Sequence, residues 1–223
     1  MTTPGQLLDS AARVDASRPM VTSYDDTRLP PERVELSVAT VLNWVVKIGN
    51  ALSSEWGLES GDSVAIDLPS HWTGAVIALA TWTLGAEIVD AGSPATGTVR
   101  SGPAALLSDR ELILTMAPMG LDLSGLVASW PDQPEFPPLS GTSDVVSAAD
   151  SLALPAGARL LSVLPFDRSA YAAASVVAPL SVGGSLILVR EANPEPARLS
   201  AIATVEQATH TAGVDVDGLA RIL

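Results

Sequence analysis

The order of segments at about 58–92 limits this chain to few folds. An apolar run at 64–68 ends at a proline, a helical pattern follows over 73–84, and a glycine precedes a second short apolar run at 87–90. A strand, a crossover helix and a further strand form a βαβ unit, in which the two strands are parallel and the connection is right-handed. The chain is therefore predicted to contain a parallel sheet with helices packed on its faces.

The same order of segments returns at about 157–190. A strand is predicted at 160–164, again ending in a Leu-Pro pair, and a helix at 170–182 that its internal proline should distort. Two glycines and a strand at 185–189 follow. Two copies are too few for a solenoid, so we predict one α/β domain over 1–223, with mainly parallel sheets built from two similar βαβ units.

The segments before the first unit predict helices and a hairpin. Apolar residues at helical spacing indicate a helix at 4–16 and a longer helix that begins after Ser37 as its N-cap. Two short apolar stretches at 21–24 and 34–36, separated by Asp and Pro residues, are typical of paired strands.

The segments between and after the two units have weaker patterns. Short strands are predicted at 104–107 and 111–115, and a long loop at about 130–150, where Pro, Ser, Gly and Asp are frequent. After the second unit we expect a helix at 197–207 and then a polar end.

Composition excludes several classes of function. The formal net charge is −13, from 12 basic and 25 acidic residues, so nucleic acid and anionic membrane surfaces are not expected partners. There is no cysteine, which removes disulfides and thiolate chemistry. The polar start of the chain lacks the pattern of a signal peptide, and no apolar run is long enough to span a bilayer. A cytoplasmic location is the resulting expectation.

Four residues at the ends of predicted strands are candidates for a pocket. His71 follows the first Leu-Pro pair, where α/β sheets often bind ligands, and it is either a helix cap or an acid–base group. Phe166, Asp167 and Arg168 occupy the matching place in the second unit. Asp167 and Arg168 either line a pocket or pair with each other at the surface, and we favour the pairing. His71 and His210 lack the spacing of metal ligands, so no metal site is predicted.

Several segments together resemble a known superfamily. Residues 34–37 (V-E-L-S), 61–69 (G-D-S-V-A-I-D-L-P) and 85–86 (G-A) resemble the opening of the adenylate-forming enzymes, which include acyl-CoA synthetases, luciferases and adenylation domains of peptide synthetases. Residues 161–166 (L-S-V-L-P-F) and 178–185 (A-P-L-S-V-G-G-S) are similar to a later segment of the same superfamily. The resemblance covers the N-terminal half of its large domain, and fits best a group of short actinobacterial relatives of unknown role.

The chain departs from this superfamily at the residues that adenylation needs. The phosphate-binding loop of the superfamily reads S-G-T-T-G-x-P-K-G, whereas here only 140–142 match, and Ser143 and Asp144 follow. The only lysine is Lys47, which lies in a predicted helix, and Asp167 stands where the superfamily has a histidine. The segments that hold adenine and ribose, and the C-terminal domain with its lysine, have no counterpart. Without this positive charge, ATP phosphates would not be compensated.

The resemblance and its departures predict a non-catalytic relative, or pseudoenzyme, that acts as a binding or interaction module. No catalytic residue and no cofactor are predicted. Two alternatives stay open: a small-molecule binder with a residual acyl or nucleotide pocket near 165–168, and an enzyme of altered chemistry that uses His71 or Asp167. A homodimer or another protein partner would cover apolar surface that the full-length enzymes bury. The sequence does not identify a small-molecule ligand.

Overall fold

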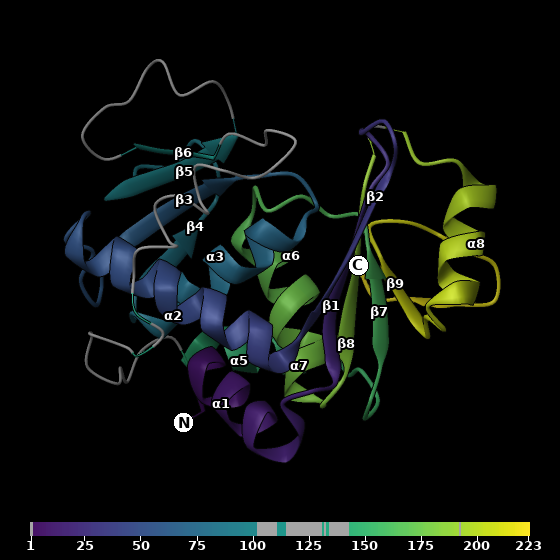
Figure 1. Ribbon diagram of the computed structural model, residues 1–223, viewed down its shortest axis with the longest axis horizontal. Helices are drawn as coiled ribbons and strands as arrows, with labels where there is room; N and C mark the ends of the chain where they lie inside the picture. The colour runs from purple at the N-terminus through teal and green to yellow at the C-terminus, as the bar shows by residue number, and fades with distance from the viewer. Residues whose placement is uncertain (1, 102–110, 115–130, 132, 134–142, 192) are drawn as a thin grey trace.

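The computed structural model describes residues 2–101, 111–114, 131, 133, 143–191 and 193–223. These residues form two β-sheets with a layer of helices between them, and a further helix, α8 (Pro196–Val205), lies on the outer face of the larger sheet (Figure 1). Among the described residues, no helix is both long enough and apolar enough to cross a membrane.

The larger sheet has six strands in the order β10-β9-β7-β8-β1-β2. All neighbouring strands are parallel except β1 and β2, which form an antiparallel hairpin. The strands are β1 (Pro19–Asp25), β2 (Glu32–Ser37), β7 (Arg159–Ser162), β8 (Ser185–Arg190), β9 (His210–Ala212) and β10 (Ala220–Arg221). The predicted hairpin is thus confirmed, and β1 joins it to the second βαβ unit through β8.

The smaller sheet has four parallel strands in the order β4-β3-β5-β6. Its strands are β3 (Ser63–Asp67), β4 (Glu87–Val89), β5 (Gly97–Ser101) and β6 (Glu111–Leu114). The first βαβ unit, β3-α3-β4, therefore belongs to this sheet, and the second unit, β7 to β8, belongs to the other. Both predicted units are confirmed as parallel pairs, each in a different sheet.

The helices between the sheets supply most of the core. They are α1 (Pro4–Asp15), α2 (Val38–Ser54), α3 (Trp72–Thr83), α5 (Ser143–Asp150), α6 (Ser169–Ala172), the π-helix η1 (Ala173–Val177) and α7 (Ala178–Ser181). On α2 one face is buried, from Val38 to Leu52, and Ser37 caps its first turn by accepting a hydrogen bond from the Thr40 N–H at 3.2 Å. On α3 ten consecutive residues from Thr73 to Trp82 are buried, because neighbouring elements enclose the helix.

The other face of the larger sheet packs against α8 (Pro196–Val205) in a second, smaller core. Leu161 and Ile187 point from the sheet into this core, and Leu199 and Ile202 point into it from the helix. Helices thus cover both faces of this sheet, as predicted from the βαβ pattern of the sequence.

One expectation about an irregular segment is wrong, and the end of the chain contains strands that were not predicted. Part of the long loop predicted at about 130–150 is a helix, because Ser143–Asp150 forms α5, whose Val146 and Ala149 are buried in the main core. The polar end of the chain contains β9 and β10. β9 has only three residues, too few for a periodic pattern, and its pairing with β7 defines it. The strand predicted at 104–107 lies outside the described residues.

The helix of the second unit is distorted as predicted. It consists of α6, one turn of π-helix and α7, which begins one residue before Pro179. A proline has no N–H to donate to the preceding turn, and π-turns are one way in which a helix accommodates that loss.

Candidate functional site

The carboxyl ends of strands from both sheets meet at one place. The Phe166 N–H, after β7, donates to the Leu68 carbonyl, after β3, at 2.7 Å, and the Ala91 N–H, after β4, donates to the Asp167 carbonyl at 2.7 Å. The predicted pocket residues Phe166–Arg168 therefore lie where both sheets end. Ligands of open α/β sheets bind at such strand ends, so this junction is the first candidate site.

Phe166 fills the interior of this junction. Its side chain is 1% exposed and packs directly on Gly74 of α3. A Cβ atom at position 74 would lie 2.4 Å from the Phe166 ring, closer than carbon atoms can approach. The ring therefore occupies space next to the helix backbone, and only a glycine leaves room for it.

The favoured pairing of Asp167 with Arg168 is wrong. The Arg168 guanidinium lies over the Tyr171 ring, 5.4 Å from its centroid, and no ion pair joins Arg168 to Asp167 in the described structure. Oδ1 of Asp167 is buried, and no hydrogen bond reaches it from the described residues. A second carboxylate lies close by, because Asp90 accepts a hydrogen bond from the Ser169 N–H at 3.0 Å. The junction therefore carries negative charge from two elements.

His71 is held as the N-cap of α3, which is one of the two roles expected for it. Its side chain accepts from the Thr73 N–H at 3.4 Å, and Nδ1 lies 3.0 Å from the Thr73 hydroxyl. The imidazole is 4% exposed. Burial lowers the pKa of His71 to about 4, the charge of Asp25 opposes that shift, and Arg190 and Arg28 add to it. The ring is therefore neutral at physiological pH.

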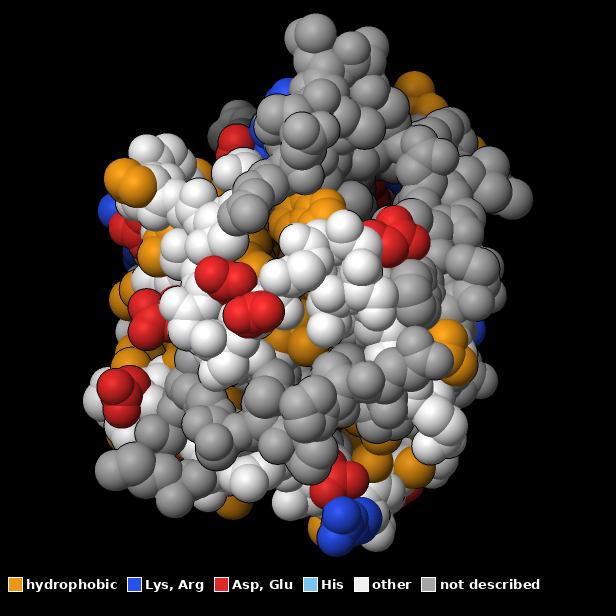
Figure 2. Space-filling model, turned by 90° about the vertical axis from the view of Figure 1, so that its left-hand side faces the viewer, with side chains coloured by type: hydrophobic (Ala, Val, Ile, Leu, Met, Phe, Trp, Pro, Cys, Tyr) orange, Lys and Arg blue, Asp and Glu red, His pale blue; other side chains and the backbone are white. Residues whose placement is uncertain are grey.

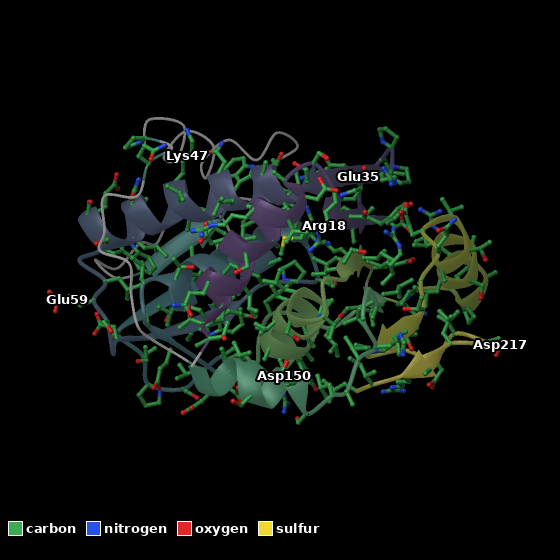
Figure 3. All side chains as sticks on the ribbon, turned by 90° about the horizontal axis from the view of Figure 1, so that it is seen from below. Arg18, Glu35, Lys47, Glu59, Asp150 and Asp217 are labelled. Carbon is green, nitrogen blue, oxygen red and sulfur yellow. The ribbon has the colours of Figure 1, made fainter. Side chains whose placement is uncertain are left out.

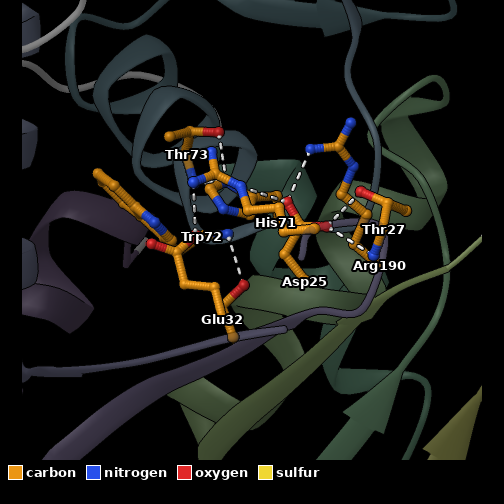
Figure 4. A network of polar contacts seen from close by, with 9 residues as sticks. Asp25, Thr27, Glu32, His71, Trp72, Thr73 and Arg190 are labelled. Carbon is orange, nitrogen blue, oxygen red and sulfur yellow. Dashed lines mark hydrogen bonds and ion pairs between the residues drawn. The ribbon is translucent and has the colours of Figure 1, made fainter. Parts of the chain in front are cut away.

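A polar cluster surrounds His71 at the end of the β1–β2 hairpin (Figure 4). Ligand atoms of Asp25, Glu32 and His71 all lie within 4.8 Å of one another, a spacing that a metal ion could use. The Asp25 carboxylate already accepts hydrogen bonds from Arg190 at 3.0 Å and Arg28 at 3.1 Å, and Arg28 also pairs with Glu32 at 3.2 Å. Because guanidinium groups compensate both carboxylates, the donor set suits a structural ion-pair network better than a metal site.

The charge state of Asp25 agrees with this interpretation. Burial opposes its charged form, but hydrogen bonds from Thr27 and the charge of Arg190 outweigh burial and hold the pKa of Asp25 below its usual value. Sequence reasoning missed this cluster, because its members come from a hairpin, a helix N-terminus and β8, and no local motif joins them.

A separate pocket lies beside β4, and its lining includes none of the four predicted residues. Its volume is about 550 Å³. It is lined by Ser60, Gly61, Trp82, Gly85, Glu87, Ile88, Asp144, Val145, Ala148, Ser169, Ala170 and Ala173. The space-filling view of this side of the molecule shows hydrophobic side chains in a hollow, with acidic side chains beside it (Figure 2). No motif in the sequence indicates this pocket, which forms where α5 and α6 approach the edge of the smaller sheet.

The fold is that of the N-terminal half of adenylate-forming enzymes. A fatty acyl CoA synthetase of Mycobacterium tuberculosis superimposes with a TM-score of 0.73 at 16% sequence identity, covering 94% of this chain and 49% of that chain. An acyl-CoA synthetase of Brucella canis gives a TM-score of 0.71 at 15% identity, covering 95% and 47%. The N-terminal domain of FACL13 from Mycobacterium tuberculosis gives 0.73 at 15% identity, covering 96% and 63%. At these identities the likeness establishes the fold, and the chain spans about half the length of the two synthetases.

One relative is similar enough to establish the family. A protein of Mycobacterium tuberculosis (strain ATCC 25618 / H37Rv), named TIGR03089 family protein, is 31% identical over 244 residues, which cover 94% of this chain and 99% of that protein. The chain belongs to the TIGR03089 family. The predicted resemblance to adenylate-forming enzymes is thus confirmed at the level of fold, and no protein-family model matches the chain.

Proposed function

We propose that this chain is a non-catalytic member of the adenylate-forming fold that acts as a binding or interaction module. The observation that carries the proposal is the character of the junction between the sheets. Phe166 fills its interior, and the carboxylates of Asp90 and Asp167 flank it. Adenylation requires positive charge around the phosphates of ATP, and two carboxylates at this place repel them.

The positions of the basic side chains support the same proposal. Lys47, the only lysine of the sequence, lies on α2, within the helix layer and not at a strand end (Figure 3). Arg168, the basic residue next to Asp167, stacks on Tyr171. The remnant of the phosphate-binding loop at 140–142 lies outside the described residues, and its sequence contains no lysine.

Two assays with Mg-ATP test the proposal. The first measures ATP–pyrophosphate exchange with a panel of fatty acids, aromatic acids and amino acids, beside an active acyl-CoA synthetase as positive control. We expect no exchange above that of the heat-denatured protein. Exchange that depends on one acid and changes in the Asp167→Asn variant would overturn the proposal and favour the alternative of an enzyme with altered chemistry.

The second assay compares thermal unfolding with and without Mg-ATP, AMP and a stable acyl-adenylate analogue. A ligand at 100 times its dissociation constant stabilises a protein by about 2.7 kcal/mol, or roughly 5–11 °C for a chain of this size. We expect no such shift. A shift with the analogue alone would instead favour a small-molecule binder with a retained acyl pocket.

A further inference from the structure

β4 is an edge strand whose free side lies along the pocket of about 550 Å³. The Glu87 N–H donates to the Asp62 carbonyl at 2.7 Å, toward β3. In a parallel strand, alternate residues direct both backbone groups to the same neighbour, so the N–H and C=O of Ile88 point away from β3. Among the described residues, nothing hydrogen-bonds to these two groups from the outer side.

The outer side of β4 is bounded by the helices that complete the pocket. Just beyond the strand, the Ala91 N–H donates to the Asp167 carbonyl, and the Asp90 carboxylate accepts from the Ser169 N–H. These bonds place α6 next to the carboxyl end of this edge. Val145 and Ala148 of α5 line the pocket farther along. The result is a trough with an unpaired strand as one wall and two helices as the other.

The lining of the trough combines an apolar surface with negative charge. Val145 and Ala148 contribute apolar surface, and the carboxylates of Glu87 and Asp144 are both solvent-exposed. None of the described residues that line the trough is a lysine or an arginine. An occupant that matches these groups is extended, carries apolar side chains on one side and is positively charged.

We propose that the trough beside β4 binds an extended basic segment of a partner protein, which adds a fifth strand to the smaller sheet. The segment's backbone pairs with the N–H and C=O of Ile88, one of its apolar side chains contacts Val145, and its Lys or Arg side chains pair with Glu87 and Asp144. A second copy of this chain is the poorer occupant, because the formal net charge of −13 makes two copies repel each other. This inference rests on the proposed function as a binding module.

The test uses the full chain and a capped peptide of alternating Lys and Val, seven residues long, with binding measured by calorimetry at low salt. A Glu–Val peptide of equal length tests charge, and a Lys–Val peptide with alternate backbone nitrogens methylated tests strand pairing. We expect saturable binding of the Lys–Val peptide only, and slower hydrogen exchange of the Ile88 amide in the complex. Equal binding of the methylated peptide, competition by spermidine at equal concentration, or no binding up to 1 mM would overturn the inference.

Matched variants locate the binding site. The Glu87→Gln/Asp144→Asn variant should bind the Lys–Val peptide about tenfold more weakly, because two exposed ion pairs are lost. The control variant, Glu195→Gln/Asp217→Asn, removes the same charge from exposed positions near α8, at the opposite end of the molecule, and should bind within about twofold of the unmodified chain. An equal loss in both variants would mean that net charge, not the trough, attracts the peptide.

The outcomes separate this inference from the proposed function. ATP–pyrophosphate exchange together with specific peptide binding would refute the non-catalytic role and leave the trough as a partner site. If neither exchange nor peptide binding is observed, the trough is refuted as a partner site and the non-catalytic role is left intact.

Discussion

Moderate acidification is predicted to destabilise this protein through the side chain of His71. The imidazole is buried and neutral, and its folded-state pKa is about 4, against 6.5 for an unperturbed histidine. Between these two values the unfolded chain binds a proton that the folded chain excludes. The stability that the neutral His71 contributes is therefore fully present above pH 6.5 and is lost as the pH decreases toward 4.

The size of the effect follows from the two pKa values. A single group with these constants makes the free energy of unfolding about 2 kcal/mol smaller at pH 5.0 than at pH 7.5. The steepest slope between the two pKa values is about 1.4 kcal/mol per pH unit. In a thermal scan the same loss corresponds to roughly 4–8 °C.

Urea unfolding at pH 7.5 and pH 5.0 measures this loss directly. The His71→Asn variant should remove the histidine's share of the pH dependence, because asparagine can cap α3 and does not titrate in this range. The matched control is His210→Asn, which changes the other histidine of the chain and should keep the full loss at pH 5.0. If His71→Asn loses as much stability between the two pH values as the unmodified chain, the reasoning is refuted.

Two further substitutions test the packing and the polar cluster. Gly74→Ala places a Cβ 2.4 Å from the Phe166 ring and should lower the free energy of unfolding by about 1–3 kcal/mol in urea titrations. Adding Phe166→Leu should recover part of this loss. No recovery would mean that another contact causes the loss. Asp25→Asn removes a buried carboxylate from the half-buried guanidinium groups of Arg28 and Arg190 and should cost about 1.5–3 kcal/mol by the same assay. A loss below about 1 kcal/mol would show that the cluster is more hydrated than its burial suggests.

The regular elements with a clear period could be predicted from the sequence. The amphipathic pattern and the Ser37 cap defined α2, and the two Leu-Pro endings marked the ends of β3 and β7. Segments whose structure depends on partners far away in sequence could not be predicted. β9 is a strand because β7 pairs with it, and α5 begins within a stretch whose turn-forming residues indicated a loop.

The candidate site was predicted in part. Three of the four predicted residues, Phe166, Asp167 and Arg168, do lie where strands of both sheets end. Their local sequence does not show that Phe166 is buried against Gly74 or that Arg168 turns to Tyr171. His71 belongs to a different cluster with Asp25, which follows from the pairing of β1 with β8 and was not visible in the sequence.

The sequence by itself determined the two βαβ units, the acidic charge and the loss of the lysine-containing phosphate loop, because each is a property of neighbouring residues or of composition. Tertiary structure decided that the units lie in separate sheets, that Phe166 closes the junction between them, and that no described residue pairs with the outer edge of β4 beside the acidic trough. Those features depend on which segments pack together, and packing is set by shape and burial over the whole chain. The local periodicity of the sequence does not indicate which distant segments come into contact.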